Sequence, residues 1–154
     1  KEGKRRGFHT VLDTSGTAAR EVIDFLLPYL DLVLYDIKHL NPDIHKDVVG
    51  AGNKAILDNL HHINGRVSIW LRVPLIPGFN DDDKALRDII ELAGGLDMEK
   101  ICFLPHHKWG SGKYAGLGRE YELDDVEDIP PKRLREIEDL CAASGLESVE
   151  ISTT

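Results

Sequence analysis

The stretch 31–40, DLVLYDIKHL, constrains the fold of this chain more than any other. Its apolar run at 32–35 is typical of a strand that is buried on both faces of a parallel sheet. Asp36 and Lys38 follow with a period of two, so an extended backbone would point both side chains to the same side. Ionisable groups are costly at the end of a buried strand, and in α/β barrels this end carries ligand-binding residues. The stretch therefore predicts a strand whose carboxyl end belongs to a binding site.

The same arrangement recurs along the chain. Further strands are predicted at 8–12, 66–73, 100–104 and 148–152. Helices are predicted between them from apolar spacing and capping residues, at 17–27, 41–49, 55–63, from 80–83 to 93, and from 130 to 145. Strands that alternate with helices form a parallel sheet through right-handed crossovers. We therefore predict one α/β domain over 1–154, a partial (β/α) barrel with about four to five parallel strands.

Composition excludes some classes of function. The chain has 27 acidic and 19 basic residues, a formal charge of −8, which argues against nonspecific nucleic-acid binding. No apolar run approaches the roughly 20 residues that cross a bilayer, so no membrane association is predicted. The first ten residues, KEGKRRGFHT, lack the apolar segment of a signal peptide, and a cytoplasmic location is expected.

Charged and polar side chains close four successive predicted strands. They are Asp13 and Thr14, then Asp36 and Lys38, then Arg72, and finally His106 and His107. Each has an ordinary reading as a helix cap, a surface ion pair, a solvated side chain or a loop residue. Four consecutive strand ends of this kind favour a shared pocket on one rim. Lysine and arginine would bind a carboxylate or phosphate there, and the aspartates an ammonium, ribose hydroxyls or a hard cation, which suits a zwitterionic ligand.

Five segments resemble one known family. They are LDTSG at 12–16, DLVLYDIKHLNPDIHKDVVG at 31–50, WLRVPLIPGFNDD at 70–82, LPHHKWGSGKYAGLG at 104–118 and YELDDVEDIPP at 121–131. In sequence and spacing they resemble the glycyl-radical-enzyme activating enzymes, most closely the pyruvate formate-lyase type. That family uses S-adenosylmethionine and a four-iron iron–sulfur cluster to abstract a hydrogen from a glycine of a partner, the glycyl radical enzyme.

The resemblance implies roles for particular residues. The cofactor-binding set would be Asp13 at the methionyl amino group, Lys38 and Arg72 at the carboxylate and ribose, His107 near the adenosyl group, and Asp36 beside them. A monovalent-cation site would use Asp13, Thr14, Asp36 and the Leu34 carbonyl. The loop 108–118 would meet the partner's glycine segment through Lys108, Trp109, Lys113 and Tyr114.

The chain departs from the family pattern in its cysteines. It lacks the cluster-binding CxxxCxxC and the glycine-glycine-glutamate motif, and its only thiols are Cys102 and Cys141. We therefore expect the carboxyl-terminal part of a catalytic domain without the N-terminal βα units, with no cluster, no catalytic residue and no activity alone. An open sheet would also expose the edge at 8–12 and invite self-association.

Two alternatives remain open at this stage. One is a Schiff-base aldolase-like barrel with Lys38 as nucleophile and Asp36 or Asp13 as proton-transfer partner. The other is a non-catalytic domain that grips a partner through the loop 108–121. Borohydride trapping on Lys38 would identify the first, and loss of partner binding on loop deletion, without affinity for S-adenosylmethionine, the second.

Overall fold

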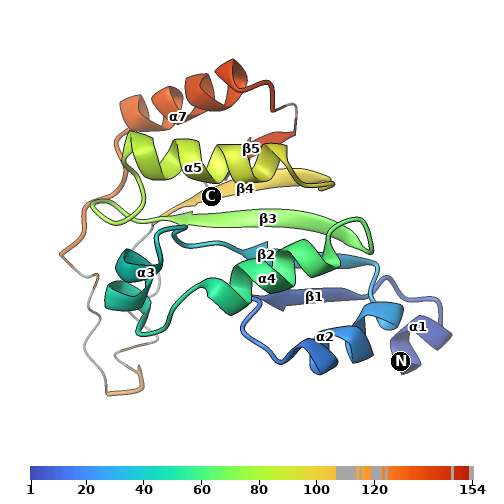
Figure 1. The fold of residues 1–154 in the computed structure, drawn as a ribbon. Coiled ribbons are helices and arrows are strands. Elements are labelled where there is room, and N and C mark those ends of the chain that lie inside the picture. The colour runs from blue at the N-terminus through green and yellow to red at the C-terminus, as the bar shows by residue number, and fades with distance from the viewer. Residues whose placement is uncertain (107–113, 115, 119–122, 124, 147, 153–154) are drawn as a thin grey trace.

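Five parallel strands form one sheet, in the order in which they occur in the sequence (Figure 1). They are β1 Val11–Thr14, β2 Leu32–Asp36, β3 Ser68–Leu75, β4 Lys100–Pro105 and β5 Val149–Ile151. Each pairs in parallel with the next. The computed structural model describes residues 1–106, 114, 116–118, 123, 125–146 and 148–152. The prediction of an α/β fold built on a parallel sheet is confirmed.

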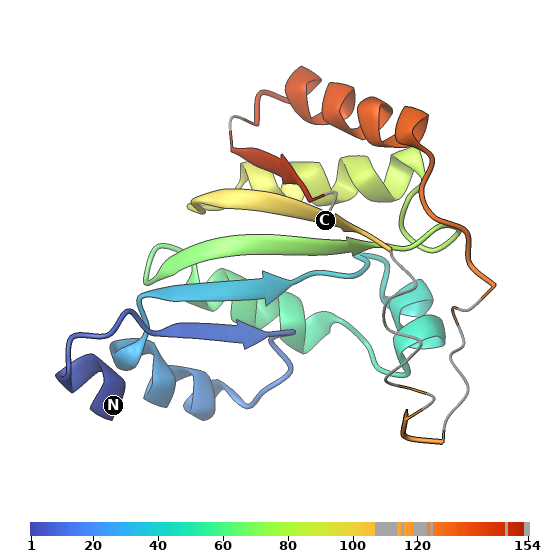
Figure 2. The same cartoon turned by 180° about the vertical axis from the view of Figure 1, so that it is seen from behind.

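The helices lie on one face of this sheet. They are α1 Glu2–Arg5, α2 Arg20–Leu26, the 3-10 turn η1 Leu27–Tyr29, α3 Pro42–Val49, α4 Lys54–Ile63, α5 Asp83–Gly94 and α7 Pro131–Ala143. Figures 1 and 2 show α4 and α5 in front of the sheet from one side and behind it from the other. Helices on the outer face of a parallel sheet are the arrangement of a partial (β/α) barrel. Among the helices of the described ranges, none combines the length and apolar character needed to cross a membrane.

The core lies between the helices and the sheet. Every second residue of the central strands contributes a side chain to this core. These side chains are at most 1% exposed and include Val33, Tyr35, Ile69, Leu71, Val73, Ile101 and Phe103. Leu34, Trp70 and Leu104 point to the other face and are only partly buried. On the face without helices, β2 is buried at Leu32, which is 7% exposed, and only partly buried at Leu34 and Asp36, so the burial expected on both of its faces is incomplete toward its end.

The turn between β1 and α2 packs directly on β2. Gly16 has φ +75°, and a Cβ there would lie 1.7 Å from the Tyr35 hydroxyl oxygen. That hydroxyl donates a hydrogen bond of 2.6 Å to the carbonyl of Ile56 in α4. Only glycine can supply both the left-handed backbone and the close approach. The turn therefore brings α4 and the first two strands together.

The strand boundaries differ most from the prediction at β1 and β3. β1 covers Val11–Thr14 rather than 8–12, because its pairing with β2 begins where Val11 lies opposite Leu32. β3 continues to Leu75 through Pro74, which pairs with Leu104 of β4 but has no N–H to donate. β3 therefore runs three residues beyond Arg72, whose contacts are described next.

Candidate functional site

An arginine and two aspartates from three neighbouring strands meet at the carboxyl ends of the sheet. Arg72 of β3 donates through Nε to Oδ1 of Asp36 in β2, at 2.7 Å, and through Nη2 to Oδ1 of Asp13 in β1. Asp36 and Arg72 are direct register partners, and Asp13 is paired with Leu34, one row below Asp36. Three of the residues predicted to share one rim are therefore in contact.

This cluster lies on the sheet face that the helices leave open. The side chains of Arg72 and Asp36 are 20% and 22% exposed, while that of Asp13 is 62% exposed. Burial lowers the pKa of the Arg72 guanidinium, whereas the Asp13 and Asp36 carboxylates beside it raise that pKa. The carboxylates outweigh the burial, so the net shift of the pKa is upward. One cation between two carboxylates leaves a net negative charge, and the exposed Asp13 can accept a second cation such as an ammonium group.

Lys38 belongs to the same rim but lies two residues beyond the end of β2. The amide of Ile37 donates to the carbonyl of Arg72 at 2.8 Å, so the backbone still runs beside β3 when it reaches Lys38. Among the ion pairs of the described residues, Asp36 pairs with Arg72 and not with Lys38, so the alternative of an Asp36–Lys38 ion pair is wrong. Lys38 is half-buried at this point, and its role as a second positive group of the rim stays a prediction.

The remaining predicted residues are mostly not placed. His107, Lys108, Trp109 and Lys113 lie outside the described residues. Tyr114 is described and is 40% exposed. Just before this segment, the amide of His106 donates to the carbonyl of Leu75 at 2.9 Å, so the chain leaves β4 beside the end of β3. The cofactor role of His107 and the partner contacts stay predictions.

The predicted monovalent-cation site also stays a prediction. Both carboxylates assigned to it bind Arg72, and the Thr14 hydroxyl accepts a hydrogen bond of 2.9 Å from the amide of Gly16. Over the described ranges, no three or more His, Cys, Asp or Glu side chains are grouped so as to hold a metal ion. The guanidinium is the cation that the structure places between the two aspartates.

Three buried asparagines hold the loops at this end of the sheet, and the sequence interpretation missed them. Each donates two hydrogen bonds of 2.7–3.0 Å to backbone carbonyls: Asn59 to Gly16 and Ala18, Asn53 to His39 and Leu40, and Asn80 to Lys38 and Pro74. The sequence predicts a helix that begins within 80–83, whereas the cap of α5 is Asp82 and Asn80 lies before it. The available signal was the polarity of asparagines next to strand ends, but it does not say which carbonyls they reach.

Comparison with known proteins places this arrangement in a family. Residues 1–90 match the model of the Radical SAM superfamily. The pyruvate formate-lyase 1-activating enzyme of Escherichia coli K12 is 40% identical over 84% of this chain and 54% of its own length. The 4-hydroxyphenylacetate decarboxylase activating enzyme of Clostridioides difficile strain 630 is 36% identical over 90% of this chain and 45% of its own.

A solved structure has the same fold. It is a domain of a pyruvate-formate lyase-activating enzyme from Bacteroides vulgatus, with a TM-score of 0.80 and 23% identity, covering 99% of this chain and 86% of that one. The chain spans about half the length of the curated relatives it matches. With a family model over more than half of its residues and relatives at this identity, the chain belongs to the radical SAM superfamily.

Proposed function

We propose that the complete protein carrying this sequence installs a glycyl radical on a partner enzyme of the pyruvate formate-lyase type, by reductive cleavage of S-adenosylmethionine. The observation that carries the proposal is the contact of Asp13, Asp36 and Arg72, which come from three neighbouring strands. Two relatives, by their names, activate pyruvate formate-lyase and 4-hydroxyphenylacetate decarboxylase. The family membership favours this activity over the aldolase alternative.

The residues of the rim fit the charges of S-adenosylmethionine. Its methionyl group is a zwitterion, and the rim offers charges of both signs in direct contact. In this proposal Asp13 accepts hydrogen bonds from the ammonium group, and Lys38 and Arg72 bind the carboxylate and ribose. Asp36 orients Arg72, and His107 lies near the adenosyl group. When bound beside a reduced iron–sulfur cluster, S-adenosylmethionine supplies the group that abstracts the hydrogen from glycine.

The thiols of this chain do not fit an iron–sulfur cluster. Such clusters are held by several cysteine thiolates, and this chain has two cysteines. Both are buried, Cys102 in β4 and Cys141 in α7, and burial raises the pKa of each thiol. We therefore assign the cluster ligands to residues outside this sequence and expect the chain alone to be inactive.

The partner is a glycyl radical enzyme in this proposal, and the loop 108–118 contacts it. Tyr114 is exposed enough to take part.

A second proposed contact joins copies of the isolated chain. β1 pairs only with β2 among the described strands. Its first residue, Val11, is 47% exposed, and Phe8, which precedes it, is 63% exposed. An edge strand with apolar neighbours supports self-association of the isolated chain.

Electron paramagnetic resonance of the partner tests the proposed activity. The complete protein is reduced without oxygen and mixed with pyruvate formate-lyase and S-adenosylmethionine, and the glycyl radical signal is measured. We expect Asp36→Ala and Lys38→Ala to reduce the signal at least about tenfold, since each removes a charge from the rim. Lys54→Ala is the control, because Lys54 pairs with Asp58 on the surface of α4.

Two outcomes would contradict the proposal. One is an undiminished radical signal in both rim variants. The other is a borohydride-trapped adduct on Lys38 with a carbonyl substrate, which would support the aldolase instead. Calorimetry on the isolated chain tests a separate point, because micromolar affinity for S-adenosylmethionine would show that residues outside this sequence are not needed for binding.

A further inference from the structure

The backbone pairing of β2 with β3 stops just before Lys38. The last register pair is Asp36 with Arg72, followed by the hydrogen bond from the Ile37 amide to the Arg72 carbonyl. In a parallel ladder the next bond would be donated by residue 74, and Pro74 has no N–H. The backbone around Lys38 therefore needs another donor to hold it beside β3.

The side chain of Asn80 supplies that donor. Its Nδ2 donates to the Lys38 carbonyl at 2.7 Å and to the Pro74 carbonyl at 2.8 Å, which bridges the two strand ends. Its Oδ1 accepts from the Ile76 amide at 2.8 Å. Asn80 is 0% exposed. Both amide hydrogens are used, so this side chain has one orientation that satisfies all its neighbours.

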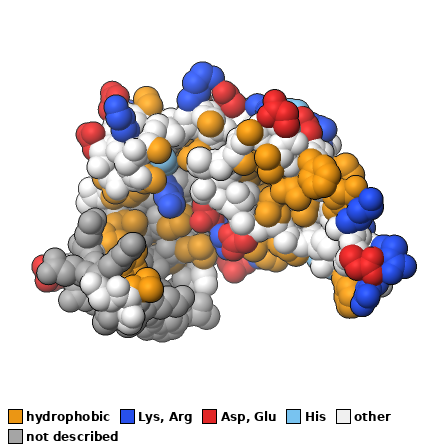
Figure 3. All heavy atoms as spheres, turned by 90° about the horizontal axis from the view of Figure 1, so that it is seen from below, with side chains coloured by type: hydrophobic (Ala, Val, Ile, Leu, Met, Phe, Trp, Pro, Cys, Tyr) orange, Lys and Arg blue, Asp and Glu red, His pale blue; other side chains and the backbone are white. Residues whose placement is uncertain are grey.

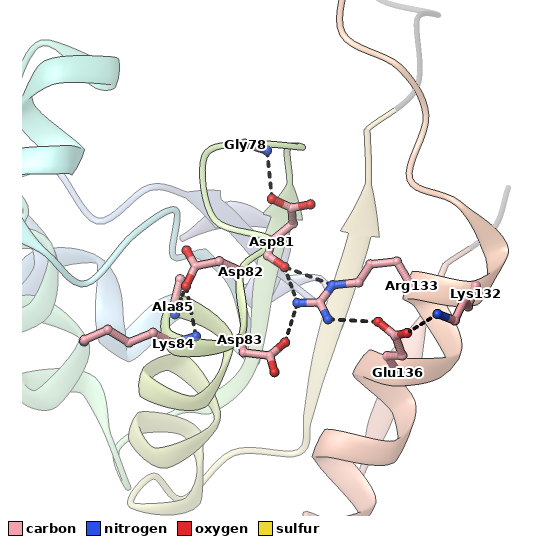
Figure 4. A network of polar contacts seen from close by, with 9 residues as sticks. All are labelled: Gly78, Asp81, Asp82, Asp83, Lys84, Ala85, Lys132, Arg133 and Glu136. Carbon is pink, nitrogen blue, oxygen red and sulfur yellow. Dashed lines mark hydrogen bonds and ion pairs between the residues drawn. The ribbon is translucent and has the colours of Figure 1, made fainter.

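The loop that carries Asn80 is itself held from the other side by α7 (Figure 4). Arg133 donates through Nε and Nη2 to the Asp81 carbonyl and pairs with Asp83 at 2.8 Å. Asp81 also accepts a hydrogen bond from the Gly78 amide at 2.8 Å. These contacts fix the residue next to Asn80, so the asparagine cannot follow Lys38 if the end of β2 moves.

We propose that Asn80 is a positioning residue for the cofactor pocket. It fixes the backbone of Lys38 against β3 and thereby sets where the Lys38 ammonium lies relative to Arg72. This inference rests on the proposed function, since it requires Lys38 to bind S-adenosylmethionine. Asn80 itself contacts backbone groups and not the ligand.

A double-mutant cycle in the complete protein tests this role. The Kd of S-adenosylmethionine is measured by calorimetry for wild type, Lys38→Ala, Asn80→Asp and the double variant. Asn80→Asp keeps the size and the acceptor for Ile76 but places a carboxylate oxygen against two carbonyls. We expect it to raise the Kd about tenfold or more in the wild-type background and not at all with Lys38→Ala, because displaced and absent lysines are equivalent.

Asn59→Asp is the matched control. Asn59 is 3% exposed and also donates two hydrogen bonds to backbone carbonyls, those of Gly16 and Ala18. Asn59→Asp therefore removes the same kind of hydrogen bonds as Asn80→Asp. Any effect of Asn59→Asp on the Kd should combine additively with that of Lys38→Ala. If Asn80→Asp does not fold, Asn80→Ser keeps one donor and should give a smaller, equally non-additive loss of affinity.

The outcomes separate this inference from the function it rests on. An Asn80→Asp effect that adds to that of Lys38→Ala, or no effect at all, overturns the positioning role. Wild-type affinity in Lys38→Ala overturns the role of the lysine and, with it, this inference. A wild-type protein that does not bind S-adenosylmethionine overturns the proposed function.

Discussion

The two faces of the sheet are made by the same strands but differ in burial and in charge. On the helix-covered face, Tyr35 and Leu71 are 0% exposed and surrounded by apolar side chains. On the other face, one residue further along each strand, Asp36 and Arg72 form a half-buried ion pair. Because side chains alternate in a strand, one step along the chain separates a residue of the apolar core from a residue of the charged cluster. Substitutions of neighbouring residues should therefore differ in kind.

The largest effect is expected from the covered face. Phe103 of β4 is fully buried, and Phe103→Ala should lower the free energy of unfolding by about 3–5 kcal/mol, through lost burial and the cavity left behind. Denaturant unfolding followed by circular dichroism measures it. Leu104→Ala is the control, since Leu104 is next in the chain and only partly buried on the open face. Equal losses for the two variants would break the comparison.

A substitution at Gly16, in the turn that packs on Tyr35, should lower the free energy of unfolding almost as much. Gly16→Ala should cost about 2–3 kcal/mol, because alanine must adopt φ +75° and its Cβ would overlap the tyrosine hydroxyl. Gly50→Ala isolates the backbone part: Gly50 has φ +82° but nothing within 4 Å of an added Cβ. Thermal unfolding of both variants gives the difference. A smaller loss in Gly16→Ala than in Gly50→Ala would show that the packing on Tyr35 is loose.

A smaller effect on stability is expected from the open face. Arg72→Met removes the cation between Asp13 and Asp36, and we expect a loss of about 1 kcal/mol in the free energy of unfolding. In the complete protein, binding of S-adenosylmethionine should fall much more than stability does. The double variant Arg72→Met, Asp13→Asn should recover part of the stability but none of the binding. A stability loss as large as that of Phe103→Ala would contradict the division of roles between the faces.

The loop that follows β2 carries His39 and should make the free energy of unfolding depend weakly on pH. Burial lowers the pKa of His39, opposed by Asp82 and Asp88, and its Nδ1 accepts a hydrogen bond of 2.9 Å from the Asn41 amide. The folded state thus binds protons less readily than the unfolded state, so this stability is complete above the unfolded pKa of about 6.5 and falls as the pH drops below it.

Chemical denaturation between about pH 5 and 8 measures this dependence. We expect a loss of less than about 1 kcal/mol at the acid end for wild type, reduced in His39→Gln, which cannot titrate. A ring resonance of His39 that titrates at or above the ordinary value would contradict the assignment.

The smallest effect on stability is expected at the free edge of the sheet. Phe8, Val11, Val22 and Phe25 are 47–69% exposed, and Figure 3 shows hydrophobic side chains gathered on the side of the molecule where α2 and β1 lie. Val11→Lys should change the free energy of unfolding by no more than about 0.5 kcal/mol but reduce self-association of the isolated chain. Sedimentation velocity over a range of concentrations measures it. A chain that is monomeric at every concentration would refute the self-association proposal.

The site was partly predictable because its charged residues interrupt apolar strands. Asp36 and Arg72 stood out as ionisable groups where a buried strand should end, and parallel strands bring such ends to one edge of a sheet. Their pairing with each other was not predictable, since it depends on the register that makes them direct partners. Lys38 was expected to share the strand with Asp36, but the strand ends at Asp36, and the side chain of Asn80 from another loop binds the backbone carbonyl of Lys38.

The sequence by itself determined the order of strands and helices, the parallel sheet and the charged residues at its rim, because these depend on periodicity and composition within short stretches of chain. Only the tertiary structure decided which face the helices cover and where β1 begins. It also decided that Asn80 donates hydrogen bonds to Lys38 and Pro74 where Pro74 interrupts the backbone pairing of β2 with β3. Those features depend on pairs of groups far apart in the chain, and a residue's neighbours in sequence do not reveal which backbone carbonyl it will meet.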